Sequence, residues 1–563
     1  MKMKMLIAGA MLAFFTSTAM AEQNFVTKFL DRYRPPTTID AAAVTSGGVP
    51  EQTLQQLIRE GNLPITVADV VRLMIESNLD VRVDRFSPLQ QQLLLDTLLR
   101  PWEPTLFLSG SMNRNSSPSV SQLVASSSLT HRYIAQFAQN FATGTGVTVT
   151  AAMNRSSDNN QFNTFNPSYG GQLTYRVTQN LLRDYGRDIN LRTLRVSRNS
   201  KTQSDIQFEM DLITLVTQAQ NNYWDLVASR EDIKVKQQSL QLAEKTLSDN
   251  KRQVEIGTLA PIDVVQTEAN VATRQEQIVL STFASDQLQD RIKKLITAVG
   301  DPAMILAKLA PTEAVHRPSP TDLMPVEDAI RYALENRPEM RQMALALQSN
   351  DIDLQYQKNQ LLPSLSVNAA YTQSGIGGNQ IDRLTHTVTS TGGLGDAFAQ
   401  IFKYNATGYS LGFNLSIPLS NKSQQAEYSR VVAQKQSNEA RRTALAQAIA
   451  LDVRNAYSTV EMNRARITAA EKSRQLAERQ LEAEQKKFQL GSGQIRFVLQ
   501  EQQNLTAAQT SEIQSLVNYT KALVDFDRAI GRTLKRNNIQ VDSNQKITLA
   551  NPAAGTTAAA QQQ

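Results

Sequence analysis

The sequence contains no cysteine and only three histidines. The absence of cysteine excludes disulfides, thiolate metal sites, a cysteine nucleophile and a lipid anchor on cysteine. His131, His316 and His386 lie far apart without metal-ligand spacing. We expect Gly392–Gly395 to lie in an outer loop, without the strand before it and the helix after it that a phosphate site needs. We therefore predict neither an enzyme nor a resident metal or cofactor.

Basic clusters and long apolar runs are also missing. Lysine and arginine form no patch with interleaved aromatic residues, which argues against nucleic-acid binding. The formal charge of +6 includes Lys2 and Lys4, and their removal with the segment described next would leave +4. After that segment, no stretch approaches the roughly 20 apolar residues of a membrane helix.

Residues 1–21 have the pattern of a secretory signal peptide. Lys2 and Lys4 precede the apolar stretch Met5–Phe15, and Ala19–Ala21 has the small-x-small pattern that signal peptidase reads. We expect cleavage before Glu22. The mature chain is then either a soluble protein outside the cytoplasm or a membrane protein built from β-strands.

Glycine and proline are absent from two long runs of equal length, 187–256 and 421–490. Their composition favours helix, and at about 1.5 Å rise per residue each run would form a rod roughly 100 Å long. Apolar residues at heptad spacing, with small alanines between them, predict close packing of such rods. A purely structural coiled coil is an equal alternative from the helices alone. The heptad residues are Ile233, Leu240, Leu247, Val254, Ile467, Leu481 and Phe488, and the alanines are Ala243, Ala470 and Ala477.

The rods belong to an internal repeat. Tyr223–Gly257 superposes on Tyr457–Gly491 in fixed register without a gap. Further upstream, Met74–Arg82 aligns with Ala333–Arg341, and the same register places Pro104 on Pro363. A repeat in fixed register predicts one pseudo-symmetric fold.

The sequence predicts strands after Pro104 and Pro363, where the period of the apolar residues changes to two. Each half of the repeat has one strand that runs away from the helices and one that runs back toward them. Each strand is long enough to cross a bilayer when tilted. Their polar faces are small and hydroxylic, as a water-filled lumen requires, although a soluble sandwich with one wet face is an alternative. The apolar faces contain Leu106, Leu108, Gly110, Met112, Leu173, Tyr175, Val177, Leu181, Leu365, Val367, Ala369, Tyr371, Tyr409, Leu411, Phe413, Leu415 and Ile417.

Long polar loops join the paired strands, as at the cell-surface end of an outer-membrane barrel. The first half contains an extra alternating pair, residues 133–141 and 147–153, around the turn Thr143–Gly146. We expect this pair to project from the loop as a hairpin, and two additional wall strands are the alternative. The loops span residues 115–130, 155–167 and 374–407.

Each rod ends in a turn marked by glycine. Gly257 and Gly491 suit a helix C-cap, and Pro261 suits a first helical turn. Return helices are expected to end near Gly300 and Gly531, and the first carries an apolar stripe. That stripe consists of Ile262, Val265, Ala269, Ala272 and Val279.

This order of elements, present twice, resembles the TolC family of outer-membrane efflux and secretion channels over residues 64–534. The resemblance implies a mixed α+β membrane protein in which a trimer assembles one transmembrane β-barrel. A long antiparallel α-helical barrel, a coiled-coil tunnel, would continue it into the periplasm. The four strands expected per chain cannot close a barrel alone. The implied location is the outer membrane of a Gram-negative-type cell, with a large periplasmic portion.

The resemblance also implies the function of a trimeric duct in a tripartite efflux pump or a type I secretion system. The partners would be a homotrimer, a periplasmic adaptor (membrane fusion) protein, an inner-membrane efflux or ABC transporter, and outer-membrane lipid. The alternative is a periplasmic coiled-coil adaptor or structural protein without its own barrel, which would have no use for apolar strands. The sequence does not specify the transported substrate.

By the same resemblance, the adaptor would dock at the glycine-marked tips. The residues expected there are Gly257, Thr258, Pro261, Gly491, Ser492 and Gly493. The pore aperture is expected at Asp263, Phe497 and Gln500.

The sequence departs from the best-known members at this aperture. Those members have acids at the positions of Phe497 and Gln500, and a bracing Tyr and Arg at the positions of Phe488 and Gly493, so only Asp263 keeps its acid. We therefore predict an apolar constriction rather than a cation-binding ring, with outward packing of Phe497 between helices as the alternative.

The predicted organisation interleaves helices and strands, so the segments do not form separate domains. They are a signal peptide (1–21), an N-terminal arm (22–64), first-repeat helices (65–103), strands and loops (104–181) and helical hairpin (182–300), a linker (301–325), second-repeat helices (326–362), strands and loop (363–420) and hairpin (421–535), and a disordered tail (536–563).

Overall fold

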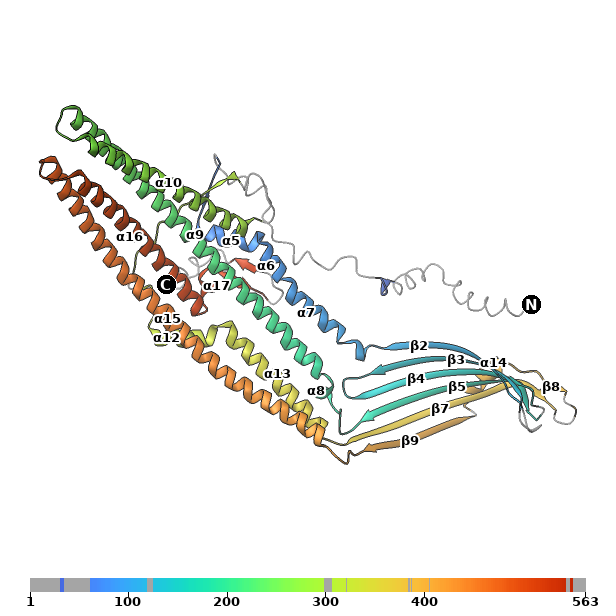
Figure 1. Ribbon diagram of the computed structural model, residues 1–563. Coiled ribbons are helices and arrows are strands. Elements are labelled where there is room, and N and C mark those ends of the chain that lie inside the picture. Colours follow the sequence, from blue (N-terminus) through green and yellow to red (C-terminus); the bar gives the residue numbers. More distant parts are fainter. Residues whose placement is uncertain are drawn as a thin grey trace, which may run out of the picture.

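The computed structural model describes residues 31–34, 61–118, 125–160, 162–297, 306–319, 321–382, 385, 387–404, 406–542 and 547–549. The molecule is elongated, with two helical hairpins at one end and a sheet at the other (Figure 1). The predicted signal peptide, nearly all of the predicted arm, Gly300, His386 and most of the predicted tail lie outside the described residues.

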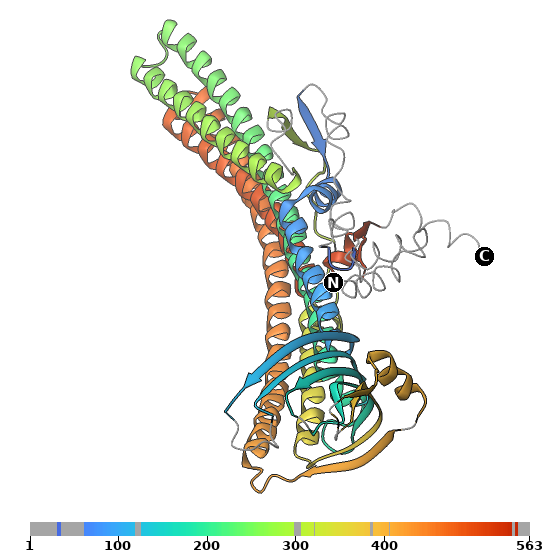
Figure 2. The ribbon, with the colours of Figure 1, turned by 90° about the vertical axis from the view of Figure 1, so that its right-hand side faces the viewer.

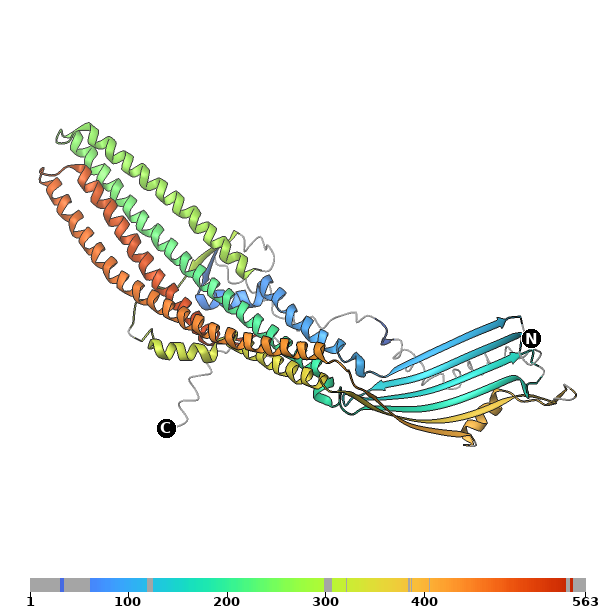
Figure 3. The same ribbon diagram turned by 60° about the horizontal axis from the view of Figure 1, so that its bottom comes forward.

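Two helical hairpins form the rod. The first consists of α9 (Arg192–Glu255) and α10 (Pro261–Ile296), and the second of α15 (Lys422–Gln489) and α16 (Ile495–Ala529). The two predicted long helices are present, although the first begins after a break at Leu191 that separates it from the short α8 (Arg187–Asn190). Helix α9 packs between α10 and α16, and α15 packs on α16, so the four helices form one layer (Figure 3). In the part of the chain that is described, no helix has both the length and the apolar character needed to cross a lipid bilayer.

Shorter helices join the rod to the sheet, and they repeat in the register that the sequence predicted. Asn78 ends α5 and its side chain accepts hydrogen bonds from the first backbone N–H groups of α6. The equivalent Arg337 ends α12, and Pro338 then begins α13. The bounds are α5 (Val67–Ser77), α6 (Leu79–Asp84), α7 (Phe86–Thr97), η1 (Arg100–Trp102), α12 (Val326–Asn336), α13 (Pro338–Gln360) and α17 (Thr533–Arg536).

The cores lie near the middle of the long helices, and the repeat places an aromatic residue in each. Tyr223 of α9 is fully buried, and its hydroxyl donates to the carbonyl oxygen of Ile65 at 3.3 Å. The equivalent Tyr457 of α15 makes an edge-on ring contact with Phe526 of α16. Ile65 belongs to β1 (Asn62–Ile65), which pairs with β6 (Lys308–Pro311) in parallel and covers the first core. A second small sheet pairs β10 (Ile539–Val541) with β11 (Ile547–Leu549). The prediction that the tail is disordered from residue 536 is therefore wrong for these strands, and Ile539 is buried in the first core.

A half-buried carboxylate anchors the linker between the repeats to the rod. Asp322 accepts hydrogen bonds from the hydroxyl of Tyr519 at 2.8 Å and from the backbone N–H of Ser319 at 2.7 Å, and His316 Nε2 lies 3.0 Å away. Burial alone would raise the pKa of Asp322, but these hydrogen bonds outweigh it and lower the pKa. Burial and the neighbouring carboxylate raise the pKa of the Tyr519 phenol.

Six long strands form one antiparallel sheet in the order β2-β3-β4-β5-β7-β9, and the short β8 pairs with the far end of β7. The sheet curves strongly when viewed along the molecule (Figure 2). The bounds are β2 (Thr105–Ser116), β3 (Ser127–Asn140), β4 (Thr145–Asp158), β5 (Phe165–Asn180), β7 (Ser364–Ile381), β8 (Val388–Ser390) and β9 (Thr407–Ser416).

The expectation that the extra pair projects as a hairpin is wrong. Strand β3 pairs with the whole length of β2, and β4 pairs with β5 over most of its length, so both belong to the sheet. Phe137 lies opposite Leu106, and Val149 opposite Tyr175, which places apolar side chains of the added strands on the face that the other strands already share. This sheet therefore contains six long strands rather than the four expected.

The pairing register gives the sheet one apolar and one polar face across all six strands. Directly opposite residues share a face, so Leu106, Phe137, Val149, Tyr175 and Tyr371 lie on the apolar face with their neighbours two residues away. Tyr409, Leu411 and Phe413 continue this face on β9 and are highly exposed. The opposite face carries mainly serine, threonine, asparagine and glutamine.

Candidate functional site at the hairpin tips

The first tip is a glycine-terminated helix end followed directly by a proline-started helix. Gly257 has φ +78° and its N–H donates to Val254 at 3.0 Å, while the N–H of Thr258 donates to Gln253 at 2.9 Å. These two bonds are the pair of a Schellman motif, and they satisfy carbonyls that the helix leaves free. Helix α10 then begins at Pro261, whose missing N–H is not needed at that position.

The second tip repeats this geometry with one added restriction. Gly491 has φ +76° and donates to Phe488 at 3.0 Å, and the N–H of Ser492 donates to Lys487 at 3.1 Å. Gly493 also donates to Lys487, and a Cβ on Gly493 would lie only 2.8 Å from the backbone nitrogen of Phe488. The predicted tip residues therefore lie together at each turn, and Figure 1 places both turns at the same end of the rod.

The three predicted aperture residues follow these turns in the first turns of α10 and α16. Asp263 and Phe497 are each the third residue of their helix, as the repeat requires, and Phe497 is 46% exposed. The guanidinium of Arg496 lies 4.7 Å from the centre of the Phe497 ring. Gln500 is exposed and donates to Asn504 at 3.1 Å. Ile495 and Val498 are buried instead, so within one chain Phe497 lies outside the packed seam of the hairpin.

Sequence reasoning missed a pair of exposed apolar residues at these tips. Ile256 and Leu490 are the C-cap residues of α9 and α15, they are equivalent in the repeat, and they are 73% and 84% exposed. The signal was present, since each apolar residue directly precedes its glycine. Their exposure on both tips offers an apolar contact surface to a partner.

The apolar stripe predicted on α10 is not packed within the chain. Ile262, Val265 and Val279 are exposed, whereas Thr267, Val271 and Arg274 form the buried face. Thr267 accepts a hydrogen bond from Asn250 of α9 at 2.9 Å. The seam inside the hairpin is therefore partly polar, and the apolar stripe faces away from it.

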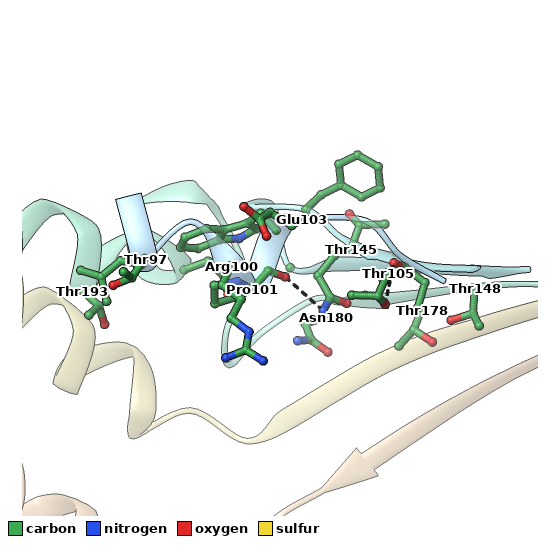
Figure 4. Close-up of a pocket in the computed structure, with 18 residues that line it drawn as sticks. Thr97, Arg100, Pro101, Glu103, Thr105, Thr145, Thr148, Thr178, Asn180 and Thr193 are labelled. Carbon is green, nitrogen blue, oxygen red and sulfur yellow. Dashed lines mark hydrogen bonds between the residues drawn. The ribbon is translucent and has the colours of Figure 1, made fainter. Parts of the chain in front are cut away.

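A hydroxyl-rich cavity of about 990 Å³ lies where the helices meet the sheet (Figure 4). Thr105, Thr148 and Thr178 reach it from the polar face of the strands, and Thr97 and Thr193 from the helices. Asn180 and Arg100 also line it. Its side chains suit a wetted passage between the rod and the sheet rather than a tight site for one ligand.

No group of three or more histidine, aspartate or glutamate residues is arranged to hold a metal ion in the described part of the chain. Of the histidines named in the sequence analysis, His316 contacts Asp322 as described above, and His131 lies on β3.

Comparisons with known proteins agree with this architecture. Residues 329–532 match the family model of outer membrane efflux proteins. The chain is 24% identical over 322 residues to OpmQ of Pseudomonas aeruginosa, a pyoverdine export outer membrane protein, which covers 57% of this chain and 61% of that protein. It is also 24% identical over 353 residues to OpmQ of Pseudomonas putida, which covers 61% and 66%. The matches thus span less than two thirds of these curated relatives.

Solved structures match over most of the chain. The outer membrane channel CmeC of Campylobacter jejuni aligns with a TM-score of 0.56 and 14% identity, covering 83% of this chain and 86% of that one. The outer membrane protein VceC of Vibrio cholerae aligns with a TM-score of 0.57 and 12% identity, covering 83% and 96%.

The fold is therefore shared with solved outer-membrane proteins, among them the CmeC channel. The match of residues 329–532 to the outer membrane efflux protein family supports the resemblance found in the sequence. Both curated relatives are named as outer membrane proteins.

Proposed function

We propose that this chain forms the trimeric outer-membrane duct of a tripartite efflux pump or type I secretion system. In this role it takes substrate from an inner-membrane efflux or ABC transporter through a periplasmic adaptor. The observation that carries the proposal is the sheet, whose apolar face spans six strands and is exposed on five of them. Among the described residues, its edge strands β2 and β9 have no strand paired on their outer sides. Such edges are stable in a membrane only when other strands pair with them.

The outer helices of the helical layer also offer surfaces for contact between copies of the chain. Its two outer helices are α10 and α15, and both carry exposed apolar residues along their length. On α10 these include Val279, Leu280 and Phe283, and on α15 they include Leu451 and Met462. Because the two edges differ, contact between them is heterologous and closes into a ring rather than a pair. Three copies are the number that the family resemblance implies.

A ring of three chains would contain eighteen long strands, because each chain contributes six. The four strands per chain expected from the sequence would have given twelve. Barrel diameter grows roughly linearly with strand number, and barrels of 16–18 strands leave an aqueous channel. The hydroxyl-rich polar face then lines a lumen about half as wide again as the one expected from four strands per chain.

The tips are the proposed adaptor-docking site. They lie at the end of the rod furthest from the sheet (Figure 1), and each presents an exposed apolar residue, Ile256 or Leu490, beside a rigid glycine cap. Asp263, Phe497 and Gln500 follow one turn later and are the proposed aperture residues. Because both curated relatives are named for pyoverdine export, a product of that kind is the first cargo to test.

The decisive experiment is the mass of the detergent-solubilised protein taken from the outer-membrane fraction. We expect a heat-resistant complex with the mass of three chains by light scattering and sedimentation. Recovery as a folded monomer would contradict the trimeric duct. Copurification with an adaptor, lost in an Ile256→Asp/Leu490→Asp variant that still forms trimers, tests docking separately.

A further inference from the structure

The expectation that residues 374–407 form a loop is wrong, because β7 extends to Ile381 and helix α14 (Leu394–Phe402) forms after β8. Gly392–Gly395 therefore follows a short strand and leads into a helix, where the sequence indicated neither. The helix packs on β5 and β7 at the end of the sheet furthest from the rod. Its first turn is capped, since the N–H of Gly393 donates to the carboxylate of Asp396 at 2.7 Å. It is therefore a regular helix packed at a defined place on β5 and β7, which we call its seat.

Three glycines of the sheet make this seat. A Cβ on Gly171 of β5 would lie 2.8 Å from the Ile401 side chain, and Cβ atoms on Gly375 and Gly377 of β7 would collide with the backbone carbonyls of Ala397 and Gly393. Ala397 and Ile401 are consequently buried against the strands. The close backbone approach needs glycine at Gly375 and Gly377, and Gly171 leaves room for the Ile401 side chain.

The seat is on the apolar face of the sheet. Gly171 lies directly opposite Gly375, and both share the side of their strands with Leu173, Tyr175 and Tyr371. The seat begins where the apolar band ends, since Gly375 and Gly377 follow Tyr371 at two-residue steps along β7. Because the rod is periplasmic, this position is at the outer boundary of the membrane.

Helix α14 also completes the edge of β7 where β9 stops. Strand β9 pairs with β7 only as far as Gln373. Beyond that point the N–H of Ile376 donates to the side-chain carbonyl of Gln400 at 3.0 Å. The helix thus satisfies a backbone group that lipid could not satisfy.

The face of α14 that the sheet does not cover is amphipathic. At about 100° per residue, Leu394, Phe398 and Phe402 lie on one side of the helix, and Asp396 and Lys403 lie on the opposite side. All three apolar side chains are exposed, Phe402 by 63%. We propose that α14 is an interfacial helix whose apolar side, Leu394, Phe398 and Phe402, inserts into the outer-leaflet lipid at the boundary with the headgroups. This requires only the outer-membrane location, and lipid is the occupant because the exposed apolar side continues the exposed apolar face of the strands.

The test uses the absence of native cysteine, because any introduced cysteine is the only thiol in the chain. Phe398→Cys and Phe402→Cys are spin-labelled in vesicles of phosphatidylethanolamine and phosphatidylglycerol, and collisions with oxygen and with an aqueous nickel chelate are measured. Lys403→Cys is the aqueous control on the opposite side of α14, and Phe413→Cys is the control on the apolar face of β9. We expect both α14 labels to resemble the Phe413 label, with high oxygen and low nickel access, and the Lys403 label to show the reverse.

Each other outcome separates this inference from the proposed function. If the α14 labels are nickel-accessible like the Lys403 label, the helix lies in water and the inference fails while the duct stands. Labels shielded from both reagents would mean that a neighbouring subunit covers α14, which also overturns lipid contact. If the Phe413 label itself is nickel-accessible, the proposed membrane face of the sheet is wrong. Electrophoresis of the intact complex confirms assembly of each variant.

Discussion

At the scale of single residues, the glycines of the two tips differ in whether a Cβ atom would fit at their positions. Gly257 and Gly491 have positive φ but open space around the missing Cβ, whereas Gly493 has no room for a Cβ against the backbone of Phe488. The repeat therefore contains two identical caps and one tighter turn. The sequence predicted the caps, because the glycines follow long runs without glycine, but it could not predict the close approach at Gly493.

We expect Gly493→Ala to distort the second tip, because the added methyl group must displace the backbone of residues 487 and 488. Amide hydrogen exchange at residues 487–493 should rise, and export should fall in cells that depend on the variant. Ser492→Ala is the matched control, since its side chain is exposed and loses only a hydrogen bond to the Lys487 carbonyl. Exchange in Gly493→Ala that equals the wild-type rate would show that the turn can absorb the methyl group.

The aperture prediction concerns Phe497 and Asp263, which occupy equivalent positions in the two hairpins. If three exposed Phe497 rings constrict the mouth, Phe497→Ala should raise single-channel conductance in a planar bilayer. If the Asp263 carboxylates lie at the same level, Asp263→Ala should weaken block by multivalent cations. A Phe497→Ala channel with wild-type conductance but lower thermal stability would assign the ring to packing between subunits.

At the scale of elements, the sequence indicated where strands and helices lie but not which of them are neighbours. Alternation indicated every long strand, including β3 and β4, because one face of each is apolar. Alternation does not say which strand is the neighbour, so the place of β3 and β4 in the sheet could not be read from it. Helix α14 was missed for a related reason, since its glycine seat comes from β5 and β7, which belong to different halves of the repeat. The α10 stripe indicated a helix correctly, but Ile262, Val265 and Val279 are exposed rather than packed within the chain.

The linker anchor gives a pH prediction. The folded-state pKa of Asp322 is below its ordinary value of 3.8, so its hydrogen bonds stabilise the fold fully above about pH 4. This contribution is lost as the pH falls from about 4 through the lowered folded-state pKa, because the carboxylate must then accept a proton. Thermal unfolding followed by circular dichroism between pH 3 and pH 7 measures it.

The Asp322→Asn variant isolates this effect. We expect it to lower stability at neutral pH by about 1–3 kcal/mol, since Tyr519 and Ser319 then bond a neutral acceptor. It should also flatten the fall in stability below pH 4. Asp328→Asn, at an exposed position on α12, should change stability by less than about 0.5 kcal/mol. An unchanged acid profile in Asp322→Asn would rule out this carboxylate as its source.

At the scale of the whole molecule, the six-strand sheet makes a prediction about pore width. A variant without residues 125–160 lacks β3 and β4 but keeps β2 and β5 antiparallel, with their apolar faces on the same side. Three such chains would close a ring of twelve strands, and the lumen area should fall to roughly half or less. Poly(ethylene glycol) added from the strand side measures this as a smaller size limit for entry. Equal limits in variant and wild type, with both trimeric, would contradict a wall of eighteen strands.

The match in width between the sheet and the helices beside it affects how a cargo moves. Where the two meet, each chain contributes four adjacent helices, α7, α9, α13 and α15. At about 8–10 Å between axes, four helices occupy roughly 32–40 Å of circumference. Six strands about 4.8 Å apart and tilted by about 40° occupy roughly 38 Å, whereas four strands would occupy roughly 25 Å. In the proposed trimer the perimeter would thus be nearly constant across the junction, so a molecule that has passed the tips would meet no ledge between the rod and the sheet.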